Sequence, residues 1–150
     1  MKLRFWTFTL VIGVFTACQN NQSTQKDEET ITSVVTEQSC YTYAKNKDTA
    51  SLMLMISGYI VTGELQYQLF EKDSNKGLIK GEMKGDTLVA DYTFNSEGKQ
   101  STRQVAFLKK DGKLMEGFGE VVEKDGKIYF KSISDLKFGD AIGFTKINCK

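Results

Sequence analysis

The fold is decided by the stretch Gly85-Asp86-Thr87-Leu88-Val89-Ala90-Asp91-Tyr92-Thr93-Phe94. After the Gly-Asp pair every second residue is apolar or aromatic, and the residues between them are mostly polar. A period of two predicts a β-strand with one buried face. The same period recurs at 52–56, 65–69, 105–107, 128–130 and 142–144.

Turn signals separate these stretches. Asp111-Gly112 and Asp125-Gly126 each lie between apolar runs, which is the strongest short signal for a hairpin. Polar and glycine-containing clusters at 73–75 and 96–98 mark further turns. We therefore expect an all-β fold, an antiparallel meander of about seven to nine strands that closes into a small barrel or folds into a sandwich. Only residues 134–140 have room for one short helical turn.

The first 17 residues have the composition of an export signal. Lys2 and Arg4 precede an apolar run over 5–15, which is well short of the roughly 20 residues of a membrane-spanning helix. Ala17 and Cys18 follow, and the chain then becomes polar. The segment resembles a bacterial lipoprotein signal, which implies that Cys18 is acylated, for example with palmitate, and holds the protein in a membrane. The alternative is an ordinary cleaved signal followed by an unrelated cysteine.

Residues 18–38 are expected to form a flexible, lipid-anchored tether, and 39–150 the β-domain. The segment from 19 to 38 is polar and has no aromatic residue, so it has little apolar surface to offset the entropy of ordering. Its charged part, 25–29, resembles acidic signals of surface lipoproteins, although a solvated linker explains it equally simply. The expected location is the cell envelope, at the outer membrane, with the periplasmic or surface face left open.

Two cysteines remain beyond Cys18. An exported chain meets an oxidising compartment, so we expect a disulfide between Cys40 and Cys149 that ties the ends of the domain together. Closing a loop of on the order of 100 residues contributes up to about 4–5 kcal/mol in the chain-entropy model. A redox pair or a metal site is the alternative. Since the chain has no His and no Cys-x-x-Cys spacing, we expect no metal and no cofactor.

The composition also argues against two classes of function, His-dependent catalysis and nucleic-acid binding. A chain without His has no Ser–His or Cys–His nucleophilic arrangement. Without Lys2 and Arg4 the 20 basic residues become 18, against 19 acidic ones, so the exported chain is nearly neutral. Such a chain has no electrostatic reason to bind nucleic acid. We expect a protein that is not an enzyme and has no nucleic-acid partner.

One charge pattern indicates a candidate ligand site formed by Arg103, Glu116 and Glu120. Arg103 shares strand parity with Val105 and Phe107, and the two glutamates share parity with Leu114. If these faces point into a barrel, the charges line a polar cavity or form an internal ion pair. Paired carboxylates would also suit acid–base work on a sugar. In the alternative, the other parity of the strand, 115, 117, 119 and 121, faces inward and both glutamates are solvated.

The region from Cys40 to Cys149 resembles small lipoproteins of Gram-negative bacteria that have no assigned activity. The likeness is carried by 40–43, 71–77, 85–94, 96–98 and 103–107. The strand pattern is also similar, at the level of the fold only, to lipocalin-like barrels. The first likeness implies an envelope lipoprotein and nothing about its activity. The apolar and aromatic strand faces separately suggest a barrel that binds a small apolar or amphipathic ligand, although the same residues would fill a closed core. The alternative is a protein-interaction module, such as an inhibitor or an envelope assembly factor.

Overall fold

The computed structural model describes residues 35–72, 74–96 and 98–150. They lie in one compact unit, Ser33–Lys150, which contains every strand and the whole core. The predicted export signal, the predicted acylation site at Cys18 and most of the predicted tether lie outside the described residues. Within the described ranges, no helix is long and apolar enough to cross a membrane.

Ten strands make up the described part of the chain. Their bounds are β1 Thr36–Lys45, β2 Asp48–Ser57, β3 Ile60–Gln68, β4 Asn75–Lys84, β5 Thr87–Ser96, β6 Lys99–Lys110, β7 Lys113–Phe118, β8 Val121–Lys124, β9 Lys127–Phe130 and β10 Lys137–Ile147. The expected helical turn at 134–140 is wrong, because a turn around Asp135 leads directly into β10. β1 starts at Thr36, so the last residues assigned to the tether belong to the first strand.

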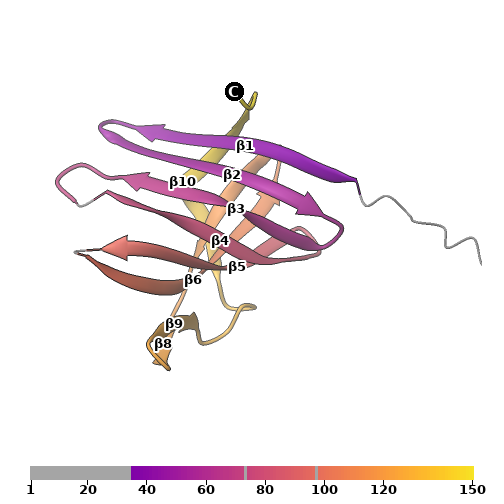
Figure 1. The fold of residues 1–150 in the computed structure, drawn as a ribbon. Coiled ribbons are helices and arrows are strands. Elements are labelled where there is room, and N and C mark those ends of the chain that lie inside the picture. Colours follow the sequence, from indigo (N-terminus) through magenta and orange to yellow (C-terminus); the bar gives the residue numbers. More distant parts are fainter. Residues whose placement is uncertain (1–34, 73, 97) are drawn as a thin grey trace, which may run out of the picture. The chain divides into compact units, whose positions relative to one another are not determined.

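The strands close into a barrel, which confirms the all-β fold and selects the barrel over the sandwich. Strands β1 to β6 form an antiparallel meander, β7 pairs with β6, and β10 pairs with both β7 and β1 (Figure 1). Eight strands therefore form the ring. The β8–β9 hairpin lies outside it, and β9 pairs in parallel with β6, a contact that the meander pattern did not predict.

The predicted hairpin turns are confirmed by their backbone. Asp111 and Gly112 have φ values of 51° and 74°, and Asp125 and Gly126 have 54° and 72°. Two successive positive φ angles are the mark of a type I′ turn, which suits the twist of the adjoining strands. Each turn therefore fixes the register of its hairpin, and with it the face on which every side chain lies.

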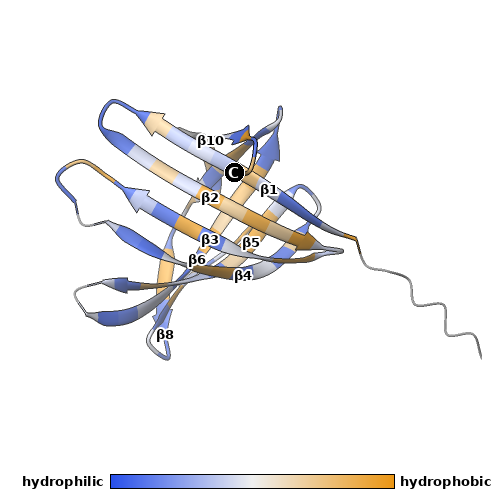
Figure 2. Ribbon diagram, turned by 45° about the horizontal axis from the view of Figure 1, so that its top comes forward, coloured by the Kyte–Doolittle hydropathy of each residue, from blue (hydrophilic) through white to orange (hydrophobic). Residues whose placement is uncertain are grey.

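The alternating residues fill the middle of the barrel. Buried residues alternate with more exposed ones along β2, and the hydropathy colouring shows an apolar stretch on this strand (Figure 2). The largest fully buried side chains are Tyr92, Phe107, Phe144, Leu52, Leu65, Ile79, Leu88 and Val61. Burial of this apolar surface, at roughly 25 cal/mol per Å², is the main stabilisation that the fold has available.

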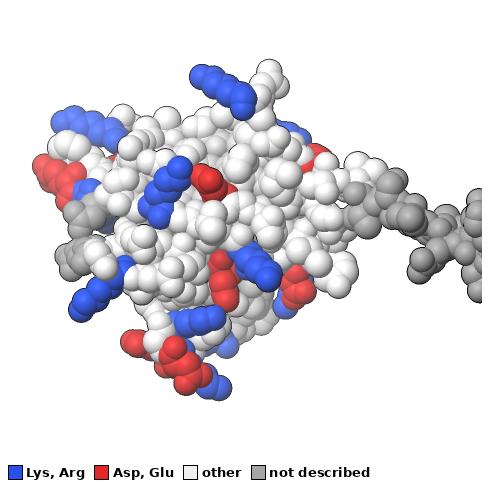
Figure 3. Space-filling view, in the orientation of Figure 1, with Lys and Arg blue, Asp and Glu red and all other residues white. Residues whose placement is uncertain are grey.

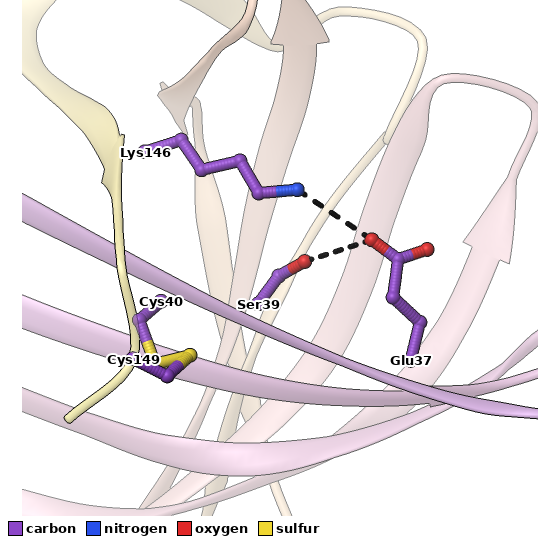
Figure 4. A network of polar contacts seen from close by, with 5 residues as sticks. All are labelled: Glu37, Ser39, Cys40, Lys146 and Cys149. Carbon is purple, nitrogen blue, oxygen red and sulfur yellow. Dashed lines mark hydrogen bonds and ion pairs between the residues drawn. A yellow bond between two sulfur atoms is a disulfide. The ribbon is translucent and has the colours of Figure 1, made fainter.

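The ring closes at a short seam between β1 and β10. Their ladder joins only Cys40–Thr42 to Thr145–Ile147, and the predicted disulfide, Cys40–Cys149, lies beside it (Figure 4). The structure thus confirms that the bond joins the first strand to the C-terminal end. It closes a sequence separation of 109 residues.

A small polar network lies next to the disulfide. The Glu37 carboxylate accepts a hydrogen bond from Ser39 Oγ at 3.0 Å, and Lys146 Nζ lies 3.5 Å from the same oxygen (Figure 4). The Ser39 hydrogen bond, followed by the charge of Lys146, lowers the pKa of Glu37 below its usual value. The network therefore adds a polar contact between β1 and β10 to the covalent bond.

Candidate functional site

The barrel wall opens where β6 and β7 separate. Their ladder ends at the pair Phe107–Glu116, after which β7 continues to Phe118 along β10. The other end of β6 is joined instead to β9, through Thr102 and Arg103 (Figure 1). We call this region the β6–β7 opening. It interrupts the wall between β6 and β7, and β9 pairs with only two residues of β6 there.

Glu116 lies at the last rung before the opening. It follows Leu114 on the inner face of β7 and is only 5% exposed. The Tyr67 hydroxyl donates a hydrogen bond to Glu116 Oε1 over 2.8 Å. Glu116 Oε2 is also buried, and no described residue provides it with a partner.

The environment of Glu116 shifts the pKa of its carboxyl group. Burial raises the pKa of the Glu116 carboxyl, while the Tyr67 hydrogen bond and the positive charge of Arg103 partly oppose the rise. Desolvation also raises the pKa of Tyr67, and it raises that of Tyr92 to about 12. Both tyrosines are therefore neutral phenols near neutral pH, and each has a proton to donate.

Arg103 points into the barrel, as the parity argument predicts. Its guanidinium carbon lies 5.5 Å from the ring centroid of Tyr67, 5.6 Å from that of Tyr92 and 5.7 Å from that of Phe94. Aromatic faces attract a cation at this range. Arg103 Nε is buried and has no hydrogen-bond partner among the described residues. The three rings therefore surround the guanidinium, while its Nε–H remains without an acceptor among the described residues.

Two cavities meet at these charges. The first, of about 400 Å³, we call the end cavity. Its polar lining comprises Tyr67, Lys72, Asn75, Ser96, Arg103 and Glu116, and its apolar lining Leu69, Phe118 and Ile142. The second, of about 290 Å³, lies at the β6–β7 opening, and we call it the side cavity. Its apolar lining comprises Val105, Phe118, Val121, Ile128 and Phe130. Arg103, Glu116 and Phe118 line both, so the two cavities adjoin.

Unpaired polar atoms concentrate at the same place. The buried side-chain atoms without a partner in the described part of the chain are Asn75 Oδ1, Tyr92 Oη, Arg103 Nε and Glu116 Oε2. Nearly all buried polar groups in folded proteins are hydrogen-bonded. Three of these four residues line the end cavity, and Tyr92 lies under the Arg103 guanidinium. The atoms therefore form one cluster that a ligand or bound water would satisfy.

The structure does not bring Glu120 together with Arg103 and Glu116, so its expected inward direction is wrong. Its side chain is 80% exposed and forms an ion pair with Lys131 at 2.7 Å. Glu120 O also accepts a hydrogen bond from Lys131 N, so the residue joins the base of the β8–β9 hairpin. The physical reason is that β7 ends at Phe118, and strand alternation does not continue through Gly119. The two carboxylates are therefore not arranged as a pair.

Sequence reasoning missed Tyr67 and Asn75. The two residues face each other across the β3–β4 ladder. Tyr67 was grouped with the apolar face of its strand, although a buried tyrosine hydroxyl usually needs a partner, and this is the signal that indicates a polar site. Asn75 stood in a turn cluster and carried no comparable signal.

Neither metal-ligand geometry nor comparison with known proteins identifies a function for this chain. Within the described ranges, no group of three or more His, Cys, Asp or Glu side chains is placed to hold a metal ion. No family model matches the chain, and no curated protein or solved structure matches it.

Proposed function

We propose that this protein is a lipid-anchored, non-enzymatic binding protein of the cell envelope. In this proposal acyl chains on Cys18 hold it at the membrane, and its barrel binds a small amphipathic ligand in the end cavity and side cavity. The observation that carries the proposal is the buried Glu116 carboxylate, whose second oxygen lies unpaired at the junction of two cavities. Ligand sites typically combine an apolar lining with a few convergent polar groups, in volumes of about 300–1,000 Å³.

The packed core limits the size of this ligand. Phe107 and Phe144 meet edge to face in the middle of the barrel, with ring centroids 5.7 Å apart, and both are fully buried. An eight-stranded barrel has room either for side chains or for one small ligand. Here side chains fill the middle, so the ligand occupies only the region beside Arg103 and Glu116.

The position of the cavity suits an anchored protein. Leu69, Lys72 and Ser96, which line the end cavity, lie where β3 and β5 end. β1 starts at the opposite end, beside the β2–β3 and β4–β5 turns (Figure 1). The first strand therefore begins at the end of the barrel away from the end cavity.

The surface charge favours a small ligand over nucleic acid. On the face drawn in Figure 3, basic and acidic side chains are interspersed, and no basic stripe forms. A phosphate backbone is bound through clustered Lys and Arg. The polar groups that lack partners are inside the barrel instead.

Native mass spectrometry tests this proposal. The unit 33–150 would be incubated with an extract of its own envelope and lightly purified. We expect an added mass of a few hundred daltons that is lost on mild activation. Ser96→Trp, which places an indole in the end cavity, should abolish the added mass, whereas Ser57→Trp at the far end of the barrel should retain it. A bare protein in every sample would overturn the proposal.

A protein-interaction role is the second candidate, and the β8–β9 hairpin favours it. β8 pairs only with β9, and Val121, Val122 and Ile128 are 51%, 42% and 41% exposed. An exposed apolar edge strand is suited to pairing with a strand of another protein. A photo-crosslinker at 122 should capture one defined partner in cells, whereas one at the exposed Leu78 on β4 should not. Equal crosslinking at both positions would remove this candidate.

A further inference from the structure

The two cavities contain opposite charges that do not neutralise each other directly. Arg103 and Glu116 line both cavities, yet neither forms an ion pair with the other or with any described residue. Each leaves one buried polar atom without a partner. An unpaired charge in a low-dielectric site is costly, so a group that bridges the two would gain from both.

The charges determine which polar head fits. A simple anion is attracted to Arg103, and to the exposed Lys72 that also lines the end cavity, but it meets the negative oxygen of Glu116. A simple cation is attracted to Glu116 but meets the guanidinium. A head that carries an acid and a primary amine satisfies both. The amine has three N–H donors, and Asn75 Oδ1, the remaining unpaired acceptor in the end cavity, provides a second place for one of them. We infer that the ligand is a zwitterion, with an amine beside an acid group on an apolar body, and this inference rests on the proposed function.

The side cavity receives the apolar body. Val105, Val121, Ile128 and Phe130 line it, and Phe118 borders both cavities. The acid would lie against Arg103 and the amine against Glu116, with the body directed toward β9. Charge-assisted hydrogen bonds are about twice as strong as neutral ones, so the head determines which amphipathic molecule is preferred.

Two sources in a cell envelope have this chemistry. One is a free amino acid with an apolar side chain, and the other is a single-chain phospholipid with an ethanolamine head. Both have an amine and an acid on an apolar body. They differ in the length of the body, so titration with each distinguishes them.

Calorimetric titration of the unit 33–150 tests the head with matched probes. The probes are 2-aminododecanoate, dodecanoate and dodecylamine, which share a long alkyl chain and differ in the head, each kept below its micelle concentration. We expect 2-aminododecanoate to bind at least about tenfold more tightly than either of the others, since a hydrogen bond to a charged group is worth about a tenfold change or more. Leucine and lysophosphatidylethanolamine, titrated next, identify the source.

Substitutions assign each charge to its part of the head. Glu116→Gln keeps the side-chain shape and should reduce 2-aminododecanoate to the affinity of dodecanoate. Arg103→Gln should reduce it to the affinity of dodecylamine. Glu120→Gln removes a carboxylate and Lys99→Gln removes a positive charge, each at an exposed position, and both should leave the preference unchanged. Thermal melting checks that each variant is folded, and Arg103→Lys, which keeps the charge, provides a second variant if Arg103→Gln is not.

The outcomes separate this inference from the proposed function. Dodecanoate or dodecylamine binding as tightly as 2-aminododecanoate overturns the zwitterion while leaving a ligand site intact. An unchanged preference in folded Glu116→Gln overturns it as well. If no alkyl probe binds but envelope extract still adds mass to the protein, the head class is wrong. If neither occurs, the proposed function is overturned too.

Discussion

The barrel wall has two places where neighbouring strands share only a short ladder, the β1–β10 seam and the β6–β7 opening. At the seam, the Cys40–Cys149 disulfide and the Glu37–Lys146 contact lie beside the ladder. At the opening, no described disulfide or ion pair joins β6 to β7, and the side cavity lies there and adjoins the end cavity. A short ladder can therefore be reinforced, as at the seam, or left without such contacts, as at the opening where we propose the ligand site.

The two places also hold carboxylates with opposite pKa shifts. Glu37 at the seam is solvated and has a hydrogen bond and a lysine, which lower its pKa. Glu116 at the opening is buried, and its pKa is raised. A lowered pKa indicates that the fold stabilises the charge, and a raised pKa that the fold disfavours it. Raised pKa values from burial, combined with a cavity, are characteristic of functional sites more than of structural ones.

We expect the largest loss of stability from truncating Phe107, the core side chain beside the β6–β7 opening. Phe107 forms the last rung with Glu116 and packs on Phe144, so it joins β6 to β10 through the core. Phe107→Ala should reduce the free energy of unfolding by about 3–5 kcal/mol, measured by urea denaturation. Phe118→Ala, at a residue that is 46% exposed, should cost much less. Equal losses would mean that the opening contributes as much packing as the core.

Breaking the disulfide should weaken the seam. The double variant Cys40→Ser, Cys149→Ser should lose about 2–5 kcal/mol of stability, because its unfolded chain is no longer restricted by a closed loop. The measurement is urea unfolding of both proteins, with intact mass showing the loss of two hydrogens in the native one. If a reductant leaves the unfolding midpoint of the native protein unchanged, the seam does not depend on the bond.

Substituting the buried carboxyl should give a smaller, pH-dependent gain. Because the folded pKa of Glu116 lies above its unfolded value of 4.5, the folded state binds its proton more strongly. Stability is therefore lost as pH rises from about 4.5 through the folded pKa. Glu116→Gln should be more stable than the native protein at neutral pH, by on the order of 1 kcal/mol, and the gain should vanish below pH 4.5. Melting curves over pH test this, and a gain that stays constant with pH contradicts it.

The smallest effect is expected at Glu37, with the opposite sign. Its folded pKa is lowered, so its contribution to stability is present above pH 4.5 and is lost as pH falls through the folded value. Glu37→Gln should destabilise the protein slightly at neutral pH, and added salt should reduce the difference. The check is the melting temperature of both proteins at low and high salt. If Glu37→Gln changed the stability by more than Glu116→Gln does, the order of the two carboxylates would be reversed.

Much of the fold was predictable because it depends on local signals. The period of two at Leu88–Phe94 and the Asp-Gly pairs at 111 and 125 identified strands and hairpins, and the structure confirms them. The inward direction of Arg103 followed from the same parity. Glu120 did not follow, because a parity argument holds only while the strand continues, and β7 ends at Phe118.

The sequence by itself determined the all-β fold, the positions of the tight turns and the pairing of Cys40 with Cys149, since period, turn chemistry and cysteine number are properties of the chain alone. Only the tertiary structure decided that the meander closes as a barrel, that β9 replaces β7 beside Arg103, and that Tyr67 lies against Glu116. Tyr67 and Glu116 are 49 residues apart in the chain. Their contact depends on the register of the five strands β3 to β7 together, which no local pattern specifies.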